Sequence, residues 1–169
     1  MLVVLSGLPG TGKSAVAVEV ARITGAVHLS IDAIEDALLG AGLERTWSTG
    51  VAAYEAVRAA AEQNLTLGRT VVVDAVNDSE AARETWRRAA TATNAALIFV
   101  LLALDDEVEH RRRLRGRNRD LSLVPEPAWD DVRWRAAEFE PWVGAHEQLD
   151  ANAPVEQLAA SVVTLINQR

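Results

Sequence analysis

The sequence contains no cysteine and only one lysine. The lack of cysteine excludes disulfides, thiolate metal sites and cysteine nucleophiles, and it agrees with a reducing compartment. No apolar run approaches the length of a membrane span, and no charged leader precedes the first apolar segment. The three histidines lack the spacing of a metal site. We therefore expect a cytoplasmic protein with no membrane partner.

The size and charge of the chain further limit its domain organisation and the kind of partner that it can bind. Its 169 residues, 49% of them hydrophobic, are enough for one ordinary domain with a full core. The net charge of −7 disfavours a broad nucleic-acid surface, although a local basic groove can still hold a short strand end. No internal repeat or low-complexity linker divides the chain. We expect a single domain over residues 1–169 that acts on a small-molecule partner, and the oligomeric state stays open.

The most informative stretch is residues 7–14, which read GLPGTGKS and match the phosphate-binding pattern GxxxxGK(S/T) without a gap. A short apolar run, residues 2–5, precedes the motif, and a helical pattern, residues 15–23, follows it directly. The motif thus lies between a strand and a helix, as its mechanism requires. The sequence therefore predicts a P-loop, or Walker A motif.

The residue types of this motif suit the binding of a nucleotide polyphosphate. Its glycines let successive backbone N–H groups approach the phosphates at the positive end of the following helix. Lys13 supplies a positive charge for the β and γ phosphates, and the hydroxyl of Ser14 is placed to ligate the Mg²⁺ that bridges them. The predicted nucleotide-binding residues are Gly7, Leu8, Pro9, Gly10, Thr11, Gly12, Lys13 and Ser14.

Strands alternate with helices along the chain, which predicts an α/β fold with a parallel sheet and helices on both faces. The expected strands lie near residues 2–5, 26–31, 70–73, 95–104 and 148–150. The expected helices cover residues 15–23, 32 to about 40, 49–67, 79 to about 91 and a stretch from 105; a further helix or pair of helices is expected from 129 to about 146, and a last helix after 154. In such sheets ligands bind at the carboxyl ends of the strands.

Asp32 follows the second predicted strand and therefore lies at the edge where ligands bind. Its carboxylate is a candidate general base that takes or orients the proton of an acceptor hydroxyl. Asp32 and Glu35 also have the spacing of a helix-capping pair, so a capping role for Asp32 is the open alternative.

Asp74 directly follows the β-branched run at residues 70–73, the arrangement of a Walker B carboxylate. It is a candidate ligand of Mg²⁺, together with Ser14, and a candidate contact for the acceptor; a strand-end turn residue is the alternative. Asn77 is a candidate substrate residue, although the Asn-Asp-Ser sequence that it begins is also ordinary turn and N-cap material.

Six arginines gather within residues 111–119, which read RRRLRGRNR. Arg113 and Arg117 are four residues apart and share one face if the helix continues that far, so that both can reach phosphates when a lid closes. Residues 116–127 contain glycine and proline and break the periodicity, which predicts a mobile, arginine-rich lid at about 111–127. The alternatives are pairing with acidic residues one turn back and a nucleic-acid patch.

Together these features resemble the small P-loop kinases, the AAA-type ATP-binding group that includes 5′ polynucleotide kinases, chloramphenicol phosphotransferases, zeta-type toxins and gluconate kinases. The resemblance rests on the P-loop, Asp32, Asp74, Arg113 and Arg117. It implies the P-loop NTPase fold with a five-stranded sheet, and ATP with Mg²⁺ as cofactors. It also implies that Asp32 is the general base and that both arginines contact the donor phosphates. The predicted catalytic residues are Lys13, Asp32, Arg113 and Arg117.

The sequence defines the phosphate acceptor less well than the phosphate donor. Glu35 occupies the position where polynucleotide kinases usually have an arginine, and residues 74–77 lack the glycine of a GTPase DxxG motif. We predict an ATP-dependent kinase that acts on a hydroxyl of an antibiotic, a sugar acid or a nucleoside-like molecule. A 5′-hydroxyl polynucleotide kinase is the alternative, and a non-catalytic nucleotide-binding regulatory module is a further one. The predicted substrate-contacting residues are Asp32, Asp74 and Asn77.

Overall fold

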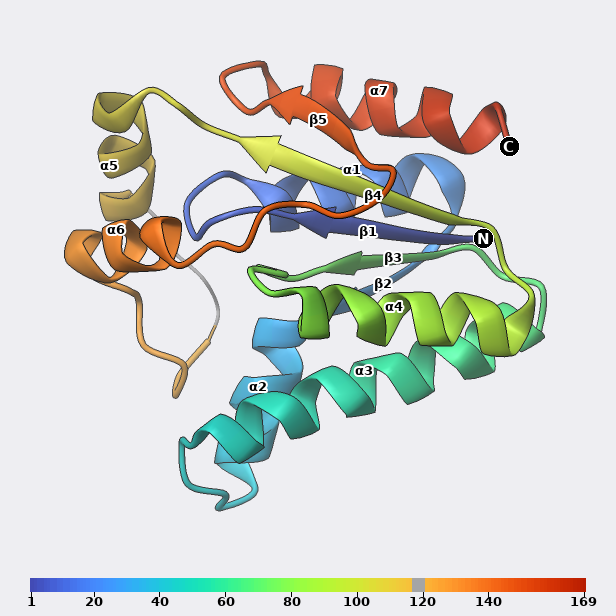
Figure 1. Cartoon of the computed structure of the whole chain (residues 1–169), viewed down its shortest axis with the longest axis horizontal. Coiled ribbons are helices and arrows are strands. Elements are labelled where there is room, and N and C mark those ends of the chain that lie inside the picture. Colours follow the sequence, from blue (N-terminus) through green and yellow to red (C-terminus); the bar gives the residue numbers. More distant parts are fainter. Residues whose placement is uncertain (117–120) are drawn as a thin grey trace.

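The structure is a computed structural model that describes residues 1–116 and 121–169. All its strands are parallel and form one sheet in the order β2-β3-β1-β4-β5 (Figure 1). This confirms the prediction of a five-stranded parallel sheet. The strands are β1 (Leu2–Ser6), β2 (Val27–Ser30), β3 (Val71–Asp74), β4 (Leu97–Ala103) and β5 (Glu147–Asp150).

Helices cover both faces of the sheet, as predicted. Figure 1 shows α1 and α7 on one face and α3 and α4 on the other. Within the described ranges, none of the helices combines the length and apolar character needed to cross a membrane. The helices are α1 (Lys13–Thr24), α2 (Ile31–Gly40), α3 (Trp47–Thr66), α4 (Glu80–Thr93), α5 (Glu107–Arg115), α6 (Trp129–Ala137) and α7 (Val155–Asn167).

The core follows from the position of β1 in the middle of the sheet. Val3 and Leu5 pack with α1 and α7, whereas Leu2 and Val4 pack with α3 and α4. Because both faces of β1 are covered, the strand reads as a continuous apolar run rather than as an alternating one. Trp86 of α4 is the largest fully buried side chain and fills the second face. The sheet is thus a rigid base whose carboxyl edge presents the P-loop.

The start of α2 differs from the prediction. The helix begins at Ile31, and its N-cap residue is Ser30. Asp32 therefore lies inside the first turn of the helix, where it does not occupy the capping position. The capping alternative for Asp32 is wrong.

The stretch after α6 also differs, because α6 ends at Ala137 and residues 138–146 form no further helix. Arg83 of α4 is fully buried, and its guanidinium donates hydrogen bonds to the carbonyl oxygens of Glu140 (2.6 Å) and Pro141 (2.8 Å). It also lies 4.3 Å from the ring centre of Trp142. These contacts hold the stretch in an irregular path, which a helical periodicity could not reveal.

Candidate active site

The P-loop connects β1 to α1 at the carboxyl edge of the sheet. Gly7 has a φ of 141°, and a Cβ atom there would lie 2.5 Å from the carbonyl oxygen of Leu102, so only glycine fits. Gly12 is the N-cap residue of α1 and has a φ of 93°. As a glycine it has no side chain that could cap the N–H groups of the first turn. The amide groups of the first turn of α1 can therefore bind an anion.

The loop is also supported from α5. His110 is buried, and its Nε2 lies 2.7 Å from the carbonyl oxygen of Pro9. Because a carbonyl oxygen only accepts, Nε2 carries the proton in this hydrogen bond. The ring of His110 also packs against Gly10, where a Cβ atom would meet it at 3.1 Å. This role of His110 was not predicted, since nothing in the residue spacing links it to the P-loop.

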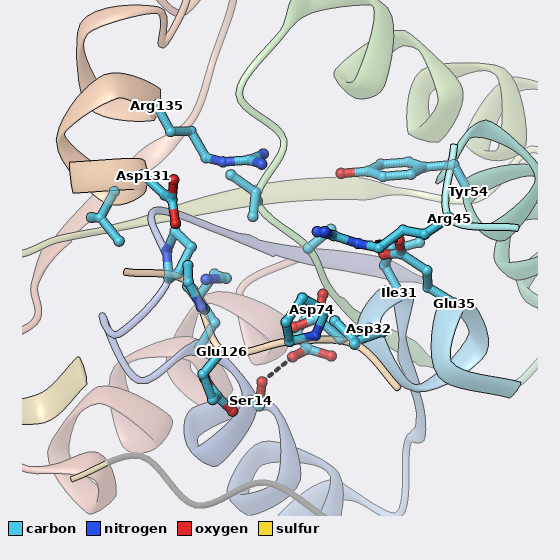
Figure 2. Close-up of a pocket in the computed structure, with 18 of the residues that line it drawn as sticks. Ser14, Ile31, Asp32, Glu35, Arg45, Tyr54, Asp74, Glu126, Asp131 and Arg135 are labelled. Atoms are coloured by element: carbon cyan, nitrogen blue, oxygen red, sulfur yellow. Dashed lines mark hydrogen bonds and ion pairs between the residues drawn. The ribbon is translucent and has the colours of Figure 1, made fainter. Parts of the chain in front are cut away.

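The two polar residues that end the motif lie at the bottom of the site. Lys13 is 7% exposed, and its ammonium group donates a hydrogen bond to the carbonyl oxygen of Leu8 at 2.9 Å. The hydroxyl of Ser14 donates a hydrogen bond to the carboxylate of Asp74 (Figure 2). The P-loop and the end of β3 are therefore directly connected, as the Walker A and Walker B prediction requires.

Asp74 is held in place by a second partner. The Nε2 atom of His28, on β2, lies 2.9 Å from the other carboxylate oxygen of Asp74. Burial raises the pKa of Asp74, but the hydrogen bonds from His28 and Ser14 and the charge of Lys13 outweigh it, so the pKa lies below its usual value. Asp74 is therefore ionised at neutral pH.

Ser14 and Asp74 fit the Mg²⁺ ion that the fold implies. A hydroxyl and an ionised carboxylate offer the hard oxygen ligands that Mg²⁺ prefers, and the ion commonly takes its other ligands from water and substrate phosphates. Within the described ranges, no cluster of three or more carboxylate or imidazole groups forms a separate metal site. The donor set thus suits a metal that binds together with a nucleotide.

A pocket of about 430 Å³ opens beside these residues. Lys13, Ser14 and Asp74 form its floor, and the P-loop residue Pro9 lies at its margin. Figure 2 shows the remaining walls, which come from α2, α3, the stretch after α5, and α6. The polar residues of these walls are Asp32, Glu35, Arg45, Tyr54, Glu126, Asp131 and Arg135.

Asp32 lies in the pocket wall with Asp74, as the sequence predicted from the strand ends. It reaches the pocket from the first turn of α2 (Figure 2). The structure therefore brings Lys13, Ser14, Asp32 and Asp74 to a single cavity. This arrangement can hold a phosphate donor on one side and a hydroxyl acceptor on the other.

Asn77 has a different environment. It is fully buried and does not line the pocket formed by the described residues. Its Nδ2 donates to the hydroxyl of Ser6 at 2.9 Å, and its Oδ1 accepts from the indole N–H of Trp86 at 2.7 Å. Its φ of 54° lies in the left-handed region, which agrees with the turn interpretation. The structure thus places Asn77 behind the pocket wall, where it orders the turn after β3.

The predicted arginine pair is only partly described. Arg113 donates to Glu109 at 2.6 Å and to the carbonyl oxygen of Ala151 at 2.7 Å, and it does not line the pocket in the described part of the chain. Arg117 lies outside the described residues. The contact with Glu109 agrees with the alternative that the helical arginines pair with acidic residues one turn back. Two further pairs of this kind are Arg111–Glu107 and Arg112–Glu109.

Residues 121–127, one of the two described parts of the predicted lid, contact α2 and reach the pocket. The backbone N–H groups of Ser122, Leu123 and Val124 donate to the carboxylate of Asp36, on α2, at 3.3, 2.7 and 2.8 Å. Residues 124–127 then line the pocket. Residues 117–120 of the predicted lid lie outside the described residues, and its mobility stays a prediction.

Four residues with possible functional roles were not found from the sequence: His28, Arg45, Tyr54 and Arg135. Each becomes recognisable only when the strand order and the packing of α2, α3 and α6 are known. His28, for example, lies beside Asp74 because β2 pairs with β3 at the edge of the sheet. No residue pattern predicts that pairing.

Comparisons with known proteins agree with this geometry. A family model described as "AAA domain" matches residues 2–139. A search of curated proteins finds no match. Among solved structures, an unliganded sugar kinase from Janibacter sp. HTCC2649 is 20% identical with a TM-score of 0.74, over 98% of this chain and 94% of that chain.

Two further kinases have a similar structure. A gluconokinase from Sinorhizobium meliloti 1021 is 20% identical with a TM-score of 0.66, over 98% of this chain and 93% of that chain. The APS kinase of Mycobacterium tuberculosis, in complex with AMPPNP and APS, is 18% identical with a TM-score of 0.71, over 98% of this chain and 96% of that chain. At these identities the likeness shows the fold, which confirms the predicted P-loop NTPase fold and the resemblance to small P-loop kinases.

Proposed function

This chain belongs to the AAA domain family, and from that premise we propose that it is a kinase that transfers the γ-phosphate of ATP to a hydroxyl group of a small molecule. The observation that carries the proposal is the position of Asp32 in the same pocket as Lys13 and Ser14. Nucleotide binding requires the P-loop but no carboxylate at the place where an acceptor would bind. Phosphoryl transfer requires both the P-loop and such a carboxylate.

The donor side of the site is built from the P-loop. Backbone N–H groups at the start of α1 and the ammonium group of Lys13 would bind the β and γ phosphates of ATP. Ser14 and Asp74 would hold Mg²⁺, which when bound neutralises part of the phosphate charge. His28 supports this arrangement because its hydrogen bond orients the carboxylate of Asp74.

The acceptor side is centred on Asp32. In the proposed step the acceptor oxygen forms a bond to the γ-phosphorus, the bond from that phosphorus to the β–γ bridging oxygen breaks, and ADP leaves. Asp32 takes the proton that the acceptor hydroxyl loses. A role for Arg113 on the transferred phosphoryl group requires its guanidinium to leave the carbonyl oxygen of Ala151, so its role and that of Arg117 stay predictions.

The pocket also supports a small acceptor over a nucleic acid. Its volume of about 430 Å³ lies in the range of small-molecule sites. Residues 124–127 and α6 cover one side of it. A 5′ end of a nucleic acid would need an open groove that continues away from Asp32, and the overall negative charge of the chain opposes such binding.

The test is the transfer of labelled γ-phosphate from ATP with Mg²⁺ to antibiotics, sugar acids, nucleosides and 5′-hydroxyl oligonucleotides. For the accepted compound, Asp32→Asn should lower the transfer rate by about 10²- to 10⁴-fold, because general-base catalysis is lost. The affinity for ATP should stay nearly unchanged. Asp105→Asn is the matched control, since Asp105 is exposed and outside the pocket, and it should behave as the wild type.

Other results would lead to different conclusions. Unchanged turnover in Asp32→Asn would remove this residue from the role of general base. Transfer to oligonucleotides alone would favour a 5′-hydroxyl polynucleotide kinase. ATP binding with no transfer to any compound would favour a nucleotide-binding regulatory module.

A further inference from the structure

Two arginines reach into the pocket from opposite walls. Arg135 comes from α6, and Arg45 comes from the connection between α2 and α3 (Figure 2). Figure 2 shows both side chains pointing into the same space, with the hydroxyl of Tyr54 beside them. These three residues are named here the upper cluster; Arg135 is distant in sequence from Arg45 and Tyr54, which lie close together around the start of α3.

Each guanidinium is oriented by a carboxylate and keeps donors for a ligand. Arg135 donates to Asp78 through Nη1 at 2.7 Å, and its side chain is 40% exposed. Within the described part of the chain, the ion pair of Arg45 is a long one, 4.0 Å from Nε to Glu35. A guanidinium carries several N–H donors in a planar fork, so one such contact leaves donors directed at the pocket.

Tyr54 adds a neutral donor to the same space. Its hydroxyl oxygen accepts the backbone N–H of Asn77 at 3.4 Å, which leaves its own proton available to a ligand. Burial, with the nearby charges of Asp78 and Asp32, raises the pKa of Tyr54 well above its usual value. The hydroxyl therefore stays protonated and can donate.

The upper cluster lies on the acceptor side of the site. Figure 2 shows Asp32 and Asp74 between the cluster and Ser14. The influence of Asp32 on the pKa of Tyr54 also indicates that the two side chains are close. A molecule with its hydroxyl at Asp32 would therefore place another of its groups at Arg45, Arg135 and Tyr54.

We propose that Arg45, Arg135 and Tyr54 bind an anionic group of the acceptor, so that the substrate is a hydroxy compound with a carboxylate or a phosphate. The inference rests on the proposed function, because it takes the space beside Asp32 as the acceptor site. Guanidinium forks bind both anions through paired, charge-assisted hydrogen bonds. An uncharged acceptor would cover the remaining guanidinium donors without offering them an anionic partner, which is unfavourable.

Acidic residues restrict where the anion can bind. Glu126 and Asp131 also line the pocket, on the wall near α6. Asp131 accepts the backbone N–H of Ala128 at 2.8 Å and thereby caps α6. Repulsion from these carboxylates directs an anion toward the space between Arg135, Arg45 and Tyr54 (Figure 2).

The experiment compares acceptors in matched pairs that differ in one anionic group. Gluconate with sorbitol tests the carboxylate, and ribose 5-phosphate with ribose tests the phosphate. Transfer from ATP is measured as kcat/KM for each compound. We expect the anionic member of at least one pair to be preferred by about 10- to 100-fold, the range for hydrogen bonds to a charged group.

Variants then assign the preference to the cluster. Arg135→Gln and Arg45→Gln should each raise the KM of the anionic acceptor by about 10-fold or more and leave the KM of ATP unchanged. Arg135→Lys keeps the charge but loses the fork, so its effect should be intermediate. Arg133→Gln is the control, because Arg133 lies on the same helix but is exposed and outside the pocket.

The outcomes separate this inference from the proposed function. Equal or better transfer to the neutral member of both pairs would overturn the anionic subsite and leave the kinase proposal intact. If no compound accepts phosphate, calorimetry with ADP, Mg²⁺ and the anionic compounds decides. Binding that is lost in Arg135→Gln but kept in Arg133→Gln would support the subsite without turnover. The absence of any binding would overturn it.

Discussion

The floor and the roof of the pocket are built in different ways. The floor consists of Lys13, Ser14 and Asp74. Lys13 donates to the carbonyl oxygen of Leu8 in the P-loop, Ser14 donates to Asp74, and Asp74 ends a strand of a sheet that is buried on both faces. The roof, residues 122–127 with α6, lies mostly at the surface, and backbone N–H groups attach it to Asp36. The floor is therefore rigid, whereas the roof depends on a few polar contacts.

This difference corresponds to a division of tasks. Polyphosphate chemistry is the same for every kinase of this fold, so the floor can be a fixed structure. Acceptors differ in size and charge, and the surface segments that bind them tolerate more change. Under the proposed function, the floor should therefore control the rate with any acceptor, and the roof, together with the wall that carries Arg45 and Tyr54, should control which acceptor binds.

Of the floor, the roof and α5, the floor is expected to give the largest effect. Lys13→Ala removes the cation on the β and γ phosphates and should lower the transfer rate by about 10²- to 10³-fold, with weaker ATP binding. Initial rates in an ATP titration measure both. Arg22→Ala, on the exposed side of the same helix, is the control and should keep the wild-type values. A normal rate in Lys13→Ala would mean that the P-loop does not act on the donor.

An intermediate effect is expected from the roof. Asp36→Asn weakens the hydrogen bonds to the backbone of Leu123 and Val124, because a neutral amide is a poorer acceptor than a carboxylate. The KM of the acceptor should rise by about 3- to 10-fold, while the KM of ATP stays unchanged. Hydrogen exchange of these two amides should also become faster. Unchanged exchange would show that Asp36 does not hold the roof.

The smallest effect concerns α5, which belongs to neither region. Hydrogen bonds from Arg112 and Arg113 lower the pKa of Glu109 to about 2 from an ordinary value of 4.5. Because the pKa of Glu109 is lower in the folded state, its pairing with the two arginines stabilises the fold. This stabilisation is fully present above pH 4.5 and is lost as the pH falls toward 2. A carboxyl NMR titration should show the low value and a rise toward the ordinary one in Arg113→Gln. An ordinary value in the wild type would contradict the pairing.

The sequence predicts the fold well for a physical reason. Strands that are buried on both faces read as apolar runs, such as residues 2–5 and 70–73, and the P-loop motif marks the link between strand and helix. The expectation of helix as far as about residue 146 is wrong beyond Ala137, because Arg83 binds carbonyl oxygens of the stretch that follows. That contact joins distant parts of the chain, and local periodicity does not contain it.

The candidate site shows the same limit. Asp32 and Asp74 are predictable, because strand ends of a parallel sheet meet at one edge. Asn77 has the residue type of a ligand contact, but its surroundings are buried, and burial of a single turn residue is not visible in the sequence. Arg45, Tyr54 and Arg135 meet only through the packing of α2, α3 and α6 around the pocket.

The order of the pocket residues along the chain has one further consequence. Among the described residues, all lining residues outside the floor fall within two continuous blocks, residues 31–54 and 124–135, apart from Pro9 and the two residues that follow Asp74. Neither block contains the P-loop or β3. Under the proposed function, exchanging one block for that of a relative should therefore change the acceptor preference and leave the residues that bind the phosphate donor unchanged.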